Sequence, residues 1–329
     1  MTVKAIEEVG KGKTYTELLI SARPAGSLAL PMAVIKGNAP GPTLTIIAGI
    51  HPTEYAGIEA ALRVAKNVVP SRVKGRLVVL PFLNLAGFNS RTPGGSPEDL
   101  LDVWRVFPGA AESSITHEVA RQVFEKVVRN SDYLIDLHGG ELNEAPPIPL
   151  AWYPRVGNRK TDAASRSLAE AFLPDYLLDA SNICLDGKRF GLPKGLLIHE
   201  AAKAGVPAII GEAGGAGRSG DEGADRLYDG IMNVCRSLGI LTGKAKKSRG
   251  TDVCDLILLG VKRDGLLYCM TKSGDRVSKG QHLADVRSWE GKVLQRIEAP
   301  FDGIVEITVN WLPVRSGEYA IAMVKPVSR

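Results

Sequence analysis

Cysteine is scarce in this chain of 329 residues, and long apolar runs are absent. The four cysteines form no CxxC pair, which argues against a zinc knuckle or a redox motif and fits reduced thiols. No apolar run is long enough to span a membrane, and residues 1–10 lack the apolar core of a secretory signal. We therefore expect a cytoplasmic protein with no membrane partner.

A strong excess of one charge is also missing. The formal net charge is only +5, and no basic stripe with interleaved aromatic residues occurs, so a nucleic-acid partner is not expected. Hydrophobic residues make up 44% and charged residues 23% of the chain, as in ordinary globular proteins. The length suits one large domain and one smaller domain.

The segment 49–57, Gly-Ile-His-Pro-Thr-Glu-Tyr-Ala-Gly, combines a histidine and a carboxylate at a predicted turn. Residues 42–48 have the alternation of a buried strand, and residues 53–69 have the apolar spacing of a helix. His51 and Glu54 would thus lie at the edge of a sheet, where α/β proteins build sites, and could supply two ligands of a catalytic zinc ion. Alternatively, His51 is a hydrogen-bonded loop residue and Glu54 a carboxylate favoured by the helix dipole.

A third ligand is found at the end of another predicted strand. Residues 131–137 are apolar and lead directly into His138, which two glycines follow. This position at the carboxyl end of a strand matches that of His51. Asp136 could accept a hydrogen bond from a ligand imidazole, or it could be a polar residue of the core.

A further predicted strand, residues 206–210, ends just before Glu212 in a glycine-rich turn. The GxGxxG fingerprint is absent and a carboxylate would repel phosphate, so we interpret Glu212 as a catalytic carboxylate. The His-Glu-Ala-Ala-Lys segment at 199–203 begins like HExxH but ends in lysine, which favours a surface helix.

The segment from Asn84 to Gly109 is too long for a simple connection. It contains Arg91 and Arg105, which could bind a carboxylate or stabilise an oxyanion. Without other evidence, the preferred interpretation of both is that they are solvated loop residues.

Together these motifs resemble the succinylglutamate desuccinylase and aspartoacylase family, a branch of the zinc carboxypeptidase-like hydrolases. The resemblance implies a three-layer α/β/α catalytic domain with a mixed sheet. It also implies that His51, Glu54 and His138 bind one zinc ion and that Glu212 is the general base. By the same resemblance, Arg91 would polarise the scissile carbonyl and Arg105 would hold a substrate carboxylate.

One residue departs from the pattern of the family. Many relatives have Asp-Leu-Asn-Arg where this chain has Asp-Val-Trp-Arg at 102–105, so Trp104 replaces a substrate-binding asparagine. An indole offers apolar surface and one hydrogen-bond donor, but it lacks the paired donor and acceptor of an amide. We hypothesise that the substrate carries a bulkier or less acidic group at this position.

From about residue 251 onward the chain has short β-branched segments separated by glycine turns, which predicts a small all-β domain. The expected division is a catalytic domain at 1–245, a polar linker, and a β-domain at 251–329. Residues 272–281 and 298–304 resemble the biotinyl and lipoyl carrier fold. Gly291 and Val293 flank Lys292 in place of the usual methionines, which disfavours a carried cofactor.

The predicted function is zinc-dependent hydrolysis of the amide bond in a small N-acyl amino acid or N-acyl amine by a metal-activated water. The expected partner is this small molecule. Further copies of the chain could also bind, in a homo-oligomer. Two alternatives stay open. One is a catalytically silent protein that binds an acylated small molecule, and the other is a carboxypeptidase acting on peptides.

Overall fold

The computed structural model describes residues 9–22, 26–145, 147–185, 188–189, 195–220, 222–248 and 250–327. Its helices are α2 (Tyr55–Asn67), α3 (Leu85–Ser90), α4 (Ile115–Lys126), α5 (Arg159–Ala171), α6 (Leu197–Lys203) and α7 (Glu222–Ser237). The strands before residue 245 are β1 (Gly12–Ala22), β2 (Gly26–Lys36), β3 (Ala39–Ala48), β4 (Lys74–Leu80), β5 (Tyr133–His138), β6 (Leu150–Tyr153), β7 (Tyr176–Asp179), β8 (Ile183–Leu185), β9 (Lys188–Arg189) and β10 (Ala208–Glu212). Those after it are β11 (Thr251–Gly260), β12 (Gly265–Cys269), β13 (Arg276–Val277), β14 (His282–Arg287), β15 (Val293–Glu298), β16 (Gly303–Thr308), β17 (Pro313–Val314) and β18 (Tyr319–Pro326).

One large mixed sheet organises the molecule. Its strand order is β1-β2-β4-β3-β5-β10-β6-β7-β11-β18-β16-β13, with β8 paired to β11 and β9 paired to β8. The four neighbours β4, β3, β5 and β10 run parallel, so their carboxyl ends meet at one edge. The predicted α/β class with a mixed sheet is therefore confirmed.

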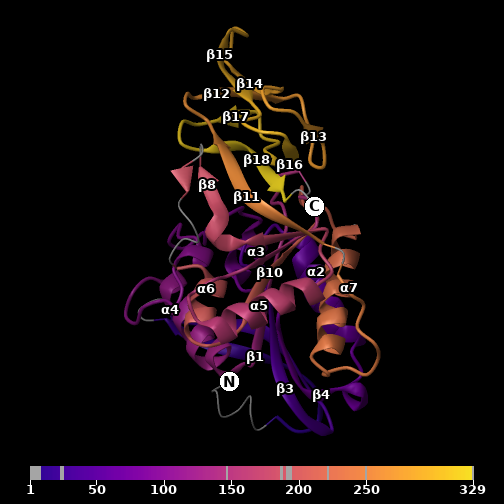
Figure 1. The fold of residues 1–329 in the computed structure, drawn as a ribbon. Helices are drawn as coiled ribbons and strands as arrows, with labels where there is room; N and C mark the ends of the chain where they lie inside the picture. Colours follow the sequence, from indigo (N-terminus) through magenta and orange to yellow (C-terminus); the bar gives the residue numbers. More distant parts are fainter. Residues whose placement is uncertain are drawn as a thin grey trace.

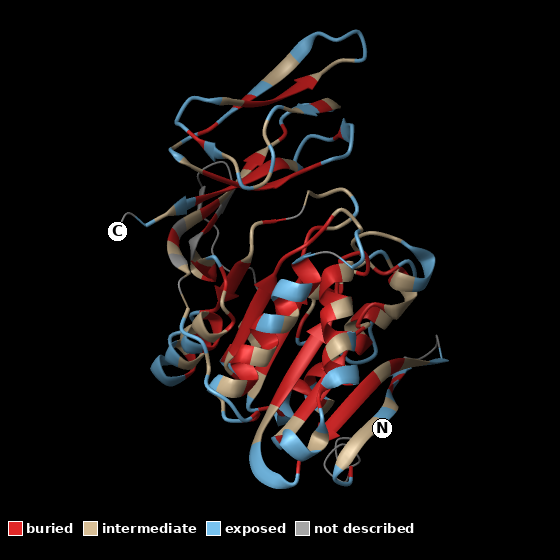
Figure 2. Ribbon diagram, turned by 90° about the vertical axis from the view of Figure 1, so that its right-hand side faces the viewer, coloured by how far each residue is buried: buried red, intermediate tan, exposed pale blue. Residues whose placement is uncertain are grey.

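Helices cover both faces of this sheet (Figure 1). Buried side chains of α2, α5 and α7 pack against one face, and those of α4 and α6 pack against the other. Figure 2 shows the consequence, because the strands and the inner sides of the helices are buried while the outer sides of the helices are exposed. Alternation along each strand sends successive side chains into the two cores.

The C-terminal part of the chain is all-β, as predicted, and its strands continue the large sheet. β11 pairs in parallel with β7 and antiparallel with β18, so it runs from the α/β layers into the upper part of Figure 1. A second, antiparallel sheet of four strands, β15-β14-β12-β17, packs there over its own apolar core. The C-terminal strands are thus hydrogen-bonded to the rest of the molecule.

Predicted and observed elements differ at several boundaries. The helix expected at 53–69 is α2, which begins two residues later and ends two residues earlier. The long segment 84–109 contains α3 and a 3₁₀ turn at Val103–Arg105, so it is partly ordered by local hydrogen bonds. The helix expected around residues 199–203 is α6, which begins at Leu197 and ends at Lys203.

Two glycines let the site-bearing segments approach one another. Gly49 follows β3 with φ of 66°, and a Cβ there would lie 2.9 Å from the Pro81 carbonyl oxygen. Gly57, in the first turn of α2, would place a Cβ 3.1 Å from the Leu137 carbonyl oxygen. The absence of a side chain at Gly49 lets the turn after β3 lie against the segment after β4, and its absence at Gly57 lets α2 pack closely on β5.

In the part of the chain that the structure describes, no helix combines the length and the apolar character needed to cross a bilayer.

Candidate active site

The predicted ligand residues meet at the carboxyl edge of the parallel strands. His51 lies in the turn after β3, Glu54 caps the start of α2, and His138 is the last residue of β5. β3 and β5 are paired neighbours, and α2 packs on β5 at Gly57. The turn and the strand end are thereby brought side by side.

A single carboxylate joins the two imidazoles. Glu54 Oε1 lies 2.7 Å from His51 Nδ1, and Glu54 Oε2 lies 3.1 Å from His138 Nδ1. Potential ligand atoms of the three residues all lie within 4.8 Å of one another. Two imidazole nitrogens and one carboxylate are a ligand set used by catalytic zinc.

The other ring nitrogen of each histidine faces an acidic residue. His51 Nε2 lies 3.6 Å from Asp102 Oδ1, and His138 Nε2 lies 3.1 Å from the fully buried Asp136. Metal-bound histidines commonly present their distal nitrogen to a carboxylate, which fixes the tautomer with Nδ1 free to bind. The arrangement therefore fits a zinc ion at the three proximal donors.

The carboxylates of this cluster favour a positive charge beside them. Burial opposes the charged form of His138, but Asp136 and Glu54 outweigh it and raise its pKa to about 10. Burial opposes ionisation of Glu54 as well, yet the two imidazoles keep its pKa below the usual value. Protons on the imidazoles or a bound metal ion can supply this charge.

Glu212 stands next to the predicted ligands. It ends β10, directly opposite His138 in the parallel pairing of β10 with β5. It is buried, and its Oε2 has no hydrogen-bond partner among the described residues. Burial raises the pKa of Glu212 to about 8, with nearby Glu54 and Glu144 adding to the shift and His138 opposing it. Such a carboxyl group can exchange a proton near neutral pH.

These residues open onto a cavity of about 280 Å³. This lies near the lower end of the range of roughly 300–1,000 Å³ typical of small-molecule pockets. One wall comes from the strand ends and loops of the α/β layers. The other comes from C-terminal strands, through Leu256, Leu258, Glu306, Ile307, Tyr319 and Ala322.

The other predicted site residues are placed differently. Trp104 lines the cavity, and its ring centroid lies 5.5 Å from that of His51 and 5.8 Å from that of His138. Arg105 lies at the exposed mouth, where its Nε donates to Asp102 Oδ2 at 3.1 Å. Arg91 caps the end of α3, is exposed, and is not among the described residues that line the cavity.

Several lining residues were missed by the sequence analysis. Glu141 and Glu144 follow His138 within six residues, so the cluster of acids after the His-Gly-Gly turn could have identified them. Glu306 was detectable as a charged residue inside the apolar strand 303–308. Asp102 and Tyr319 gave no comparable indication, because their place depends on how distant segments pack.

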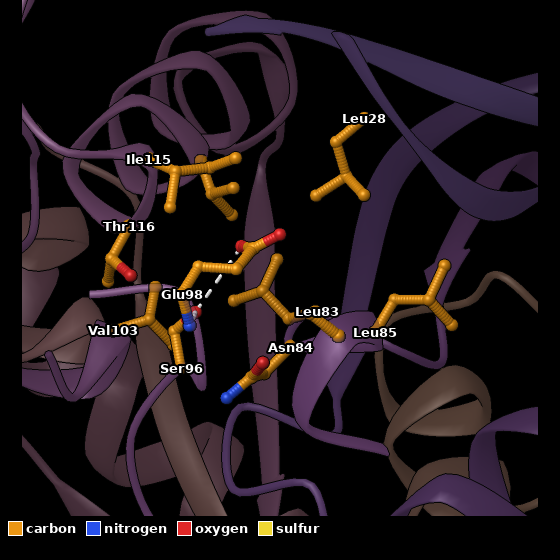
Figure 3. A pocket seen from close by; sticks show the side chains of 11 residues that line it. Leu28, Leu83, Asn84, Leu85, Ser96, Glu98, Val103, Ile115 and Thr116 are labelled. Atoms are coloured by element: carbon orange, nitrogen blue, oxygen red, sulfur yellow. Dashed lines mark hydrogen bonds between the residues drawn. The ribbon is translucent and has the colours of Figure 1, made fainter. Parts of the chain in front are cut away.

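A second cavity lies near α3 and the start of α4 (Figure 3). Figure 3 shows Leu28, Leu83 and Ile115 around the side chain of Glu98, whose carboxylate accepts a hydrogen bond from Ser96 at 3.4 Å. Its volume of about 20 Å³ is the space of about one water molecule. It is therefore too small for the predicted substrates.

The sequence matches known proteins over much of its length. The model of the succinylglutamate desuccinylase/aspartoacylase catalytic domain matches residues 40–238. N-alpha-acetyl-L-2,4-diaminobutyric acid deacetylase of Halomonas elongata is 27% identical over 279 residues, which cover 79% of this chain and 75% of the relative.

Solved structures share the fold. The ectoine utilization protein EutE of Ruegeria pomeroyi, solved with product bound, superposes with a TM-score of 0.83 at 24% identity, over 96% of each chain. A succinylglutamate desuccinylase of Silicibacter sp. TM1040 gives a TM-score of 0.82 at 23% identity, over 97% of this chain and 96% of the other. The likeness extends over both the α/β layers and the C-terminal strands.

The contact between Asp136 and His138 generates the first prediction. Asp136→Asn removes the charge behind His138 Nε2, so we expect zinc affinity to fall by about 10–100-fold. Competition with a chromophoric chelator measures this affinity. Asp132→Asn, an exposed position just before β5, is the matched control and should keep the wild-type value. Equal affinities for both variants would remove Asp136 from this role.

Proposed function

Because the chain belongs to the succinylglutamate desuccinylase/aspartoacylase family, we propose that it is a zinc-dependent hydrolase of the amide bond in a small N-acyl amino acid. The observation that carries this proposal is the convergence of His51 Nδ1 and His138 Nδ1 on the carboxylate of Glu54. One zinc ion per chain would be held by these three residues. The similarity to the Halomonas elongata deacetylase supports an acylated amino acid as substrate.

The chain's own residues prepare this site for the ion. Asp136 and Asp102 place negative charge behind the two imidazoles, and Glu54 contributes negative charge between them. When bound, zinc would lower the pKa of a water molecule, polarise the scissile carbonyl and favour the ionised form of Glu212.

Glu212 is the proposed general base. Its unpartnered Oε2 is buried at the end of β10, next to the ligand His138. There it would take a proton from the attacking water and give it to the nitrogen of the leaving amine, which balances the hydrolysis. Its surroundings hold its pKa near the range in which both transfers are possible.

We assign the orientation of the substrate to residues at the mouth of the cavity. Arg105 is paired with Asp102 and lies 5.3 Å from the centroid of the Trp104 ring, and we propose that its guanidinium would bind the α-carboxylate of an amino acid. The role of Arg91 at the scissile carbonyl stays a prediction. Because Arg91 is exposed at the end of α3, that contact would require movement of the segment that follows it.

The architecture supports a small substrate over a peptide. Strands β11, β16 and β18 close one side of the cavity, which leaves little room for a polypeptide. We propose that residues 1–245 form a carboxypeptidase-like catalytic domain and that residues 251–329 form a β-domain, of the carrier-like type expected from the sequence, that caps it.

Glu212→Gln tests the assignment of the base. This isosteric change should keep zinc bound but lower kcat by about 10²–10⁴-fold, because the amide cannot accept the water proton. Steady-state assays of acetate release, with metal content measured on the same sample, separate the two effects. Glu170→Gln on α5, outside the cavity, is the control. Full activity of Glu212→Gln would exclude Glu212 as the base.

Trp104→Asn tests the hypothesis about substrate preference. Restoring the amide should raise kcat/KM for N-acetylaspartate relative to N-acetyl-2-aminobutyrate by about tenfold, since one added hydrogen bond to a charged group is worth this factor. The ratio is insensitive to partial loss of metal. Trp289→Asn, at a highly exposed position, is the control and should leave the ratio unchanged. An unchanged ratio for Trp104→Asn as well would contradict the hypothesis.

A further inference from the structure

Glu306 is a buried carboxyl group without a partner. It lies in β16, whose other residues from 304 to 308 are uncharged, and only 2% of its surface is exposed. Its Oε1 makes no hydrogen bond to any described residue, although the side chain lines the cavity. Burying a carboxyl oxygen without a partner is costly, so a ligand in the cavity is expected to supply one.

Glu144, in the loop after β5, and Tyr319, in β18, line the cavity together with Glu306. The Tyr319 hydroxyl donates a hydrogen bond to Glu144 Oε1. The loop that carries Glu144 is fixed to the end of β16, because the amide of Ala145 donates to the Thr308 carbonyl oxygen at 2.9 Å. Both carboxyl groups are therefore held in place by the junction between the α/β layers and the C-terminal strands.

Carboxyl groups outnumber basic side chains around the cavity. Six carboxyl groups line it, and Arg105 is the one lysine or arginine among the described lining residues. That guanidinium lies at the exposed mouth and is already paired with Asp102. Burial raises the pKa of both Glu144 and Glu306, so a cation beside them would favour their ionised forms, whereas an anionic substrate side chain would oppose ionisation.

A second metal ion is a poorer fit to Glu144 and Glu306 than an ammonium group. Among the described residues, only His51, Glu54 and His138 form a group of three donors close enough together to hold a metal ion. An ammonium group has three N–H donors, so it can donate one hydrogen bond to each of two carboxylates that are too far apart to bind one metal ion together. Burial, together with the charges of Glu212 and Glu144, raises the pKa of Glu306 well above its usual value, and an adjacent cation would relieve this destabilisation.

We propose that Glu306 and Glu144, the latter positioned by Tyr319, form a subsite for a protonated amine, so that the preferred substrates are N-acyl amino acids with a second, cationic amino group. This inference rests on the proposed amide hydrolase function. It gives the C-terminal strands, through Glu306 and Tyr319, a part in substrate selection, while the bond-breaking residues come from the α/β layers. No covalent step is added, because the ammonium group is bound and does not react.

The test compares substrates of similar size and different charge on the full zinc-loaded chain. N-alpha-acetyl-2,4-diaminobutyrate carries the ammonium group, N-acetyl-2-aminobutyrate lacks it, and N-acetylaspartate carries a negative charge instead. We expect wild-type kcat/KM to be about 100-fold higher for the first than for the second, and lowest for the third. Glu306→Gln should reduce the first ratio to about tenfold or less, whereas Glu290→Gln, exposed outside the cavity, should not change it.

Calorimetry with the free amino acids 2,4-diaminobutyrate and 2-aminobutyrate provides a readout that needs no turnover. Tighter binding of the diamine, lost in Glu306→Gln, supports the subsite even if no substrate is hydrolysed, in which case the hydrolase function alone fails. Hydrolysis without preference for the cation, or a preference that survives in Glu306→Gln, overturns the subsite and leaves the hydrolase. Absence of both hydrolysis and diamine binding overturns both. A melting temperature within a few degrees of wild type verifies that Glu306→Gln is folded.

Discussion

The carboxylate of Glu54, set between the Nδ1 atoms of His51 and His138, is the interaction on which the candidate site depends. It exists because three segments meet at one edge of the sheet: the turn after β3, the start of α2 and the end of β5. The close approach of α2 to β5 at Gly57 holds Glu54 within reach of His138. A carboxylate buried between two imidazoles needs compensating positive charge, which a zinc ion at these donors would supply.

The C-terminal strands supply one wall of the cavity, and the α/β layers supply the other. β11 extends the large sheet beyond β7, and this continuity fixes β16 and β18 over the cavity. The two walls would therefore contribute different groups to the site. Groups that would bind metal and move protons lie at the strand ends of the α/β layers, whereas groups that would contact the substrate come from both walls, Trp104 and Arg105 from one and Glu306 from the other. The excess of carboxyl groups around the cavity favours a cationic substrate and agrees with the hypothesis, made from Trp104, of a less acidic one.

Much of this arrangement could be predicted from the sequence because its determinants are local. Alternating or apolar segments that end in His51, His138 and Glu212 predict strands with polar residues at their carboxyl ends, and such ends meet at one edge of a parallel sheet. Glu306 and Tyr319 could not be placed in this way, since their position depends on pairing between strands far apart in the chain. Arg91 illustrates the same limit, because its motif suggested a site residue while the fold of its loop leaves the side chain exposed.

The most direct measurement is the zinc content of protein purified without a metal-affinity step, by elemental mass spectrometry, for wild type beside His138→Ala and the control His117→Ala. The account predicts about one zinc per chain in the wild type and in His117→Ala, and loss of the metal in His138→Ala. A wild-type chain that carries no zinc and is neither bound nor stabilised by added zinc would contradict it. So would a His138→Ala variant that retains the metal at full stoichiometry.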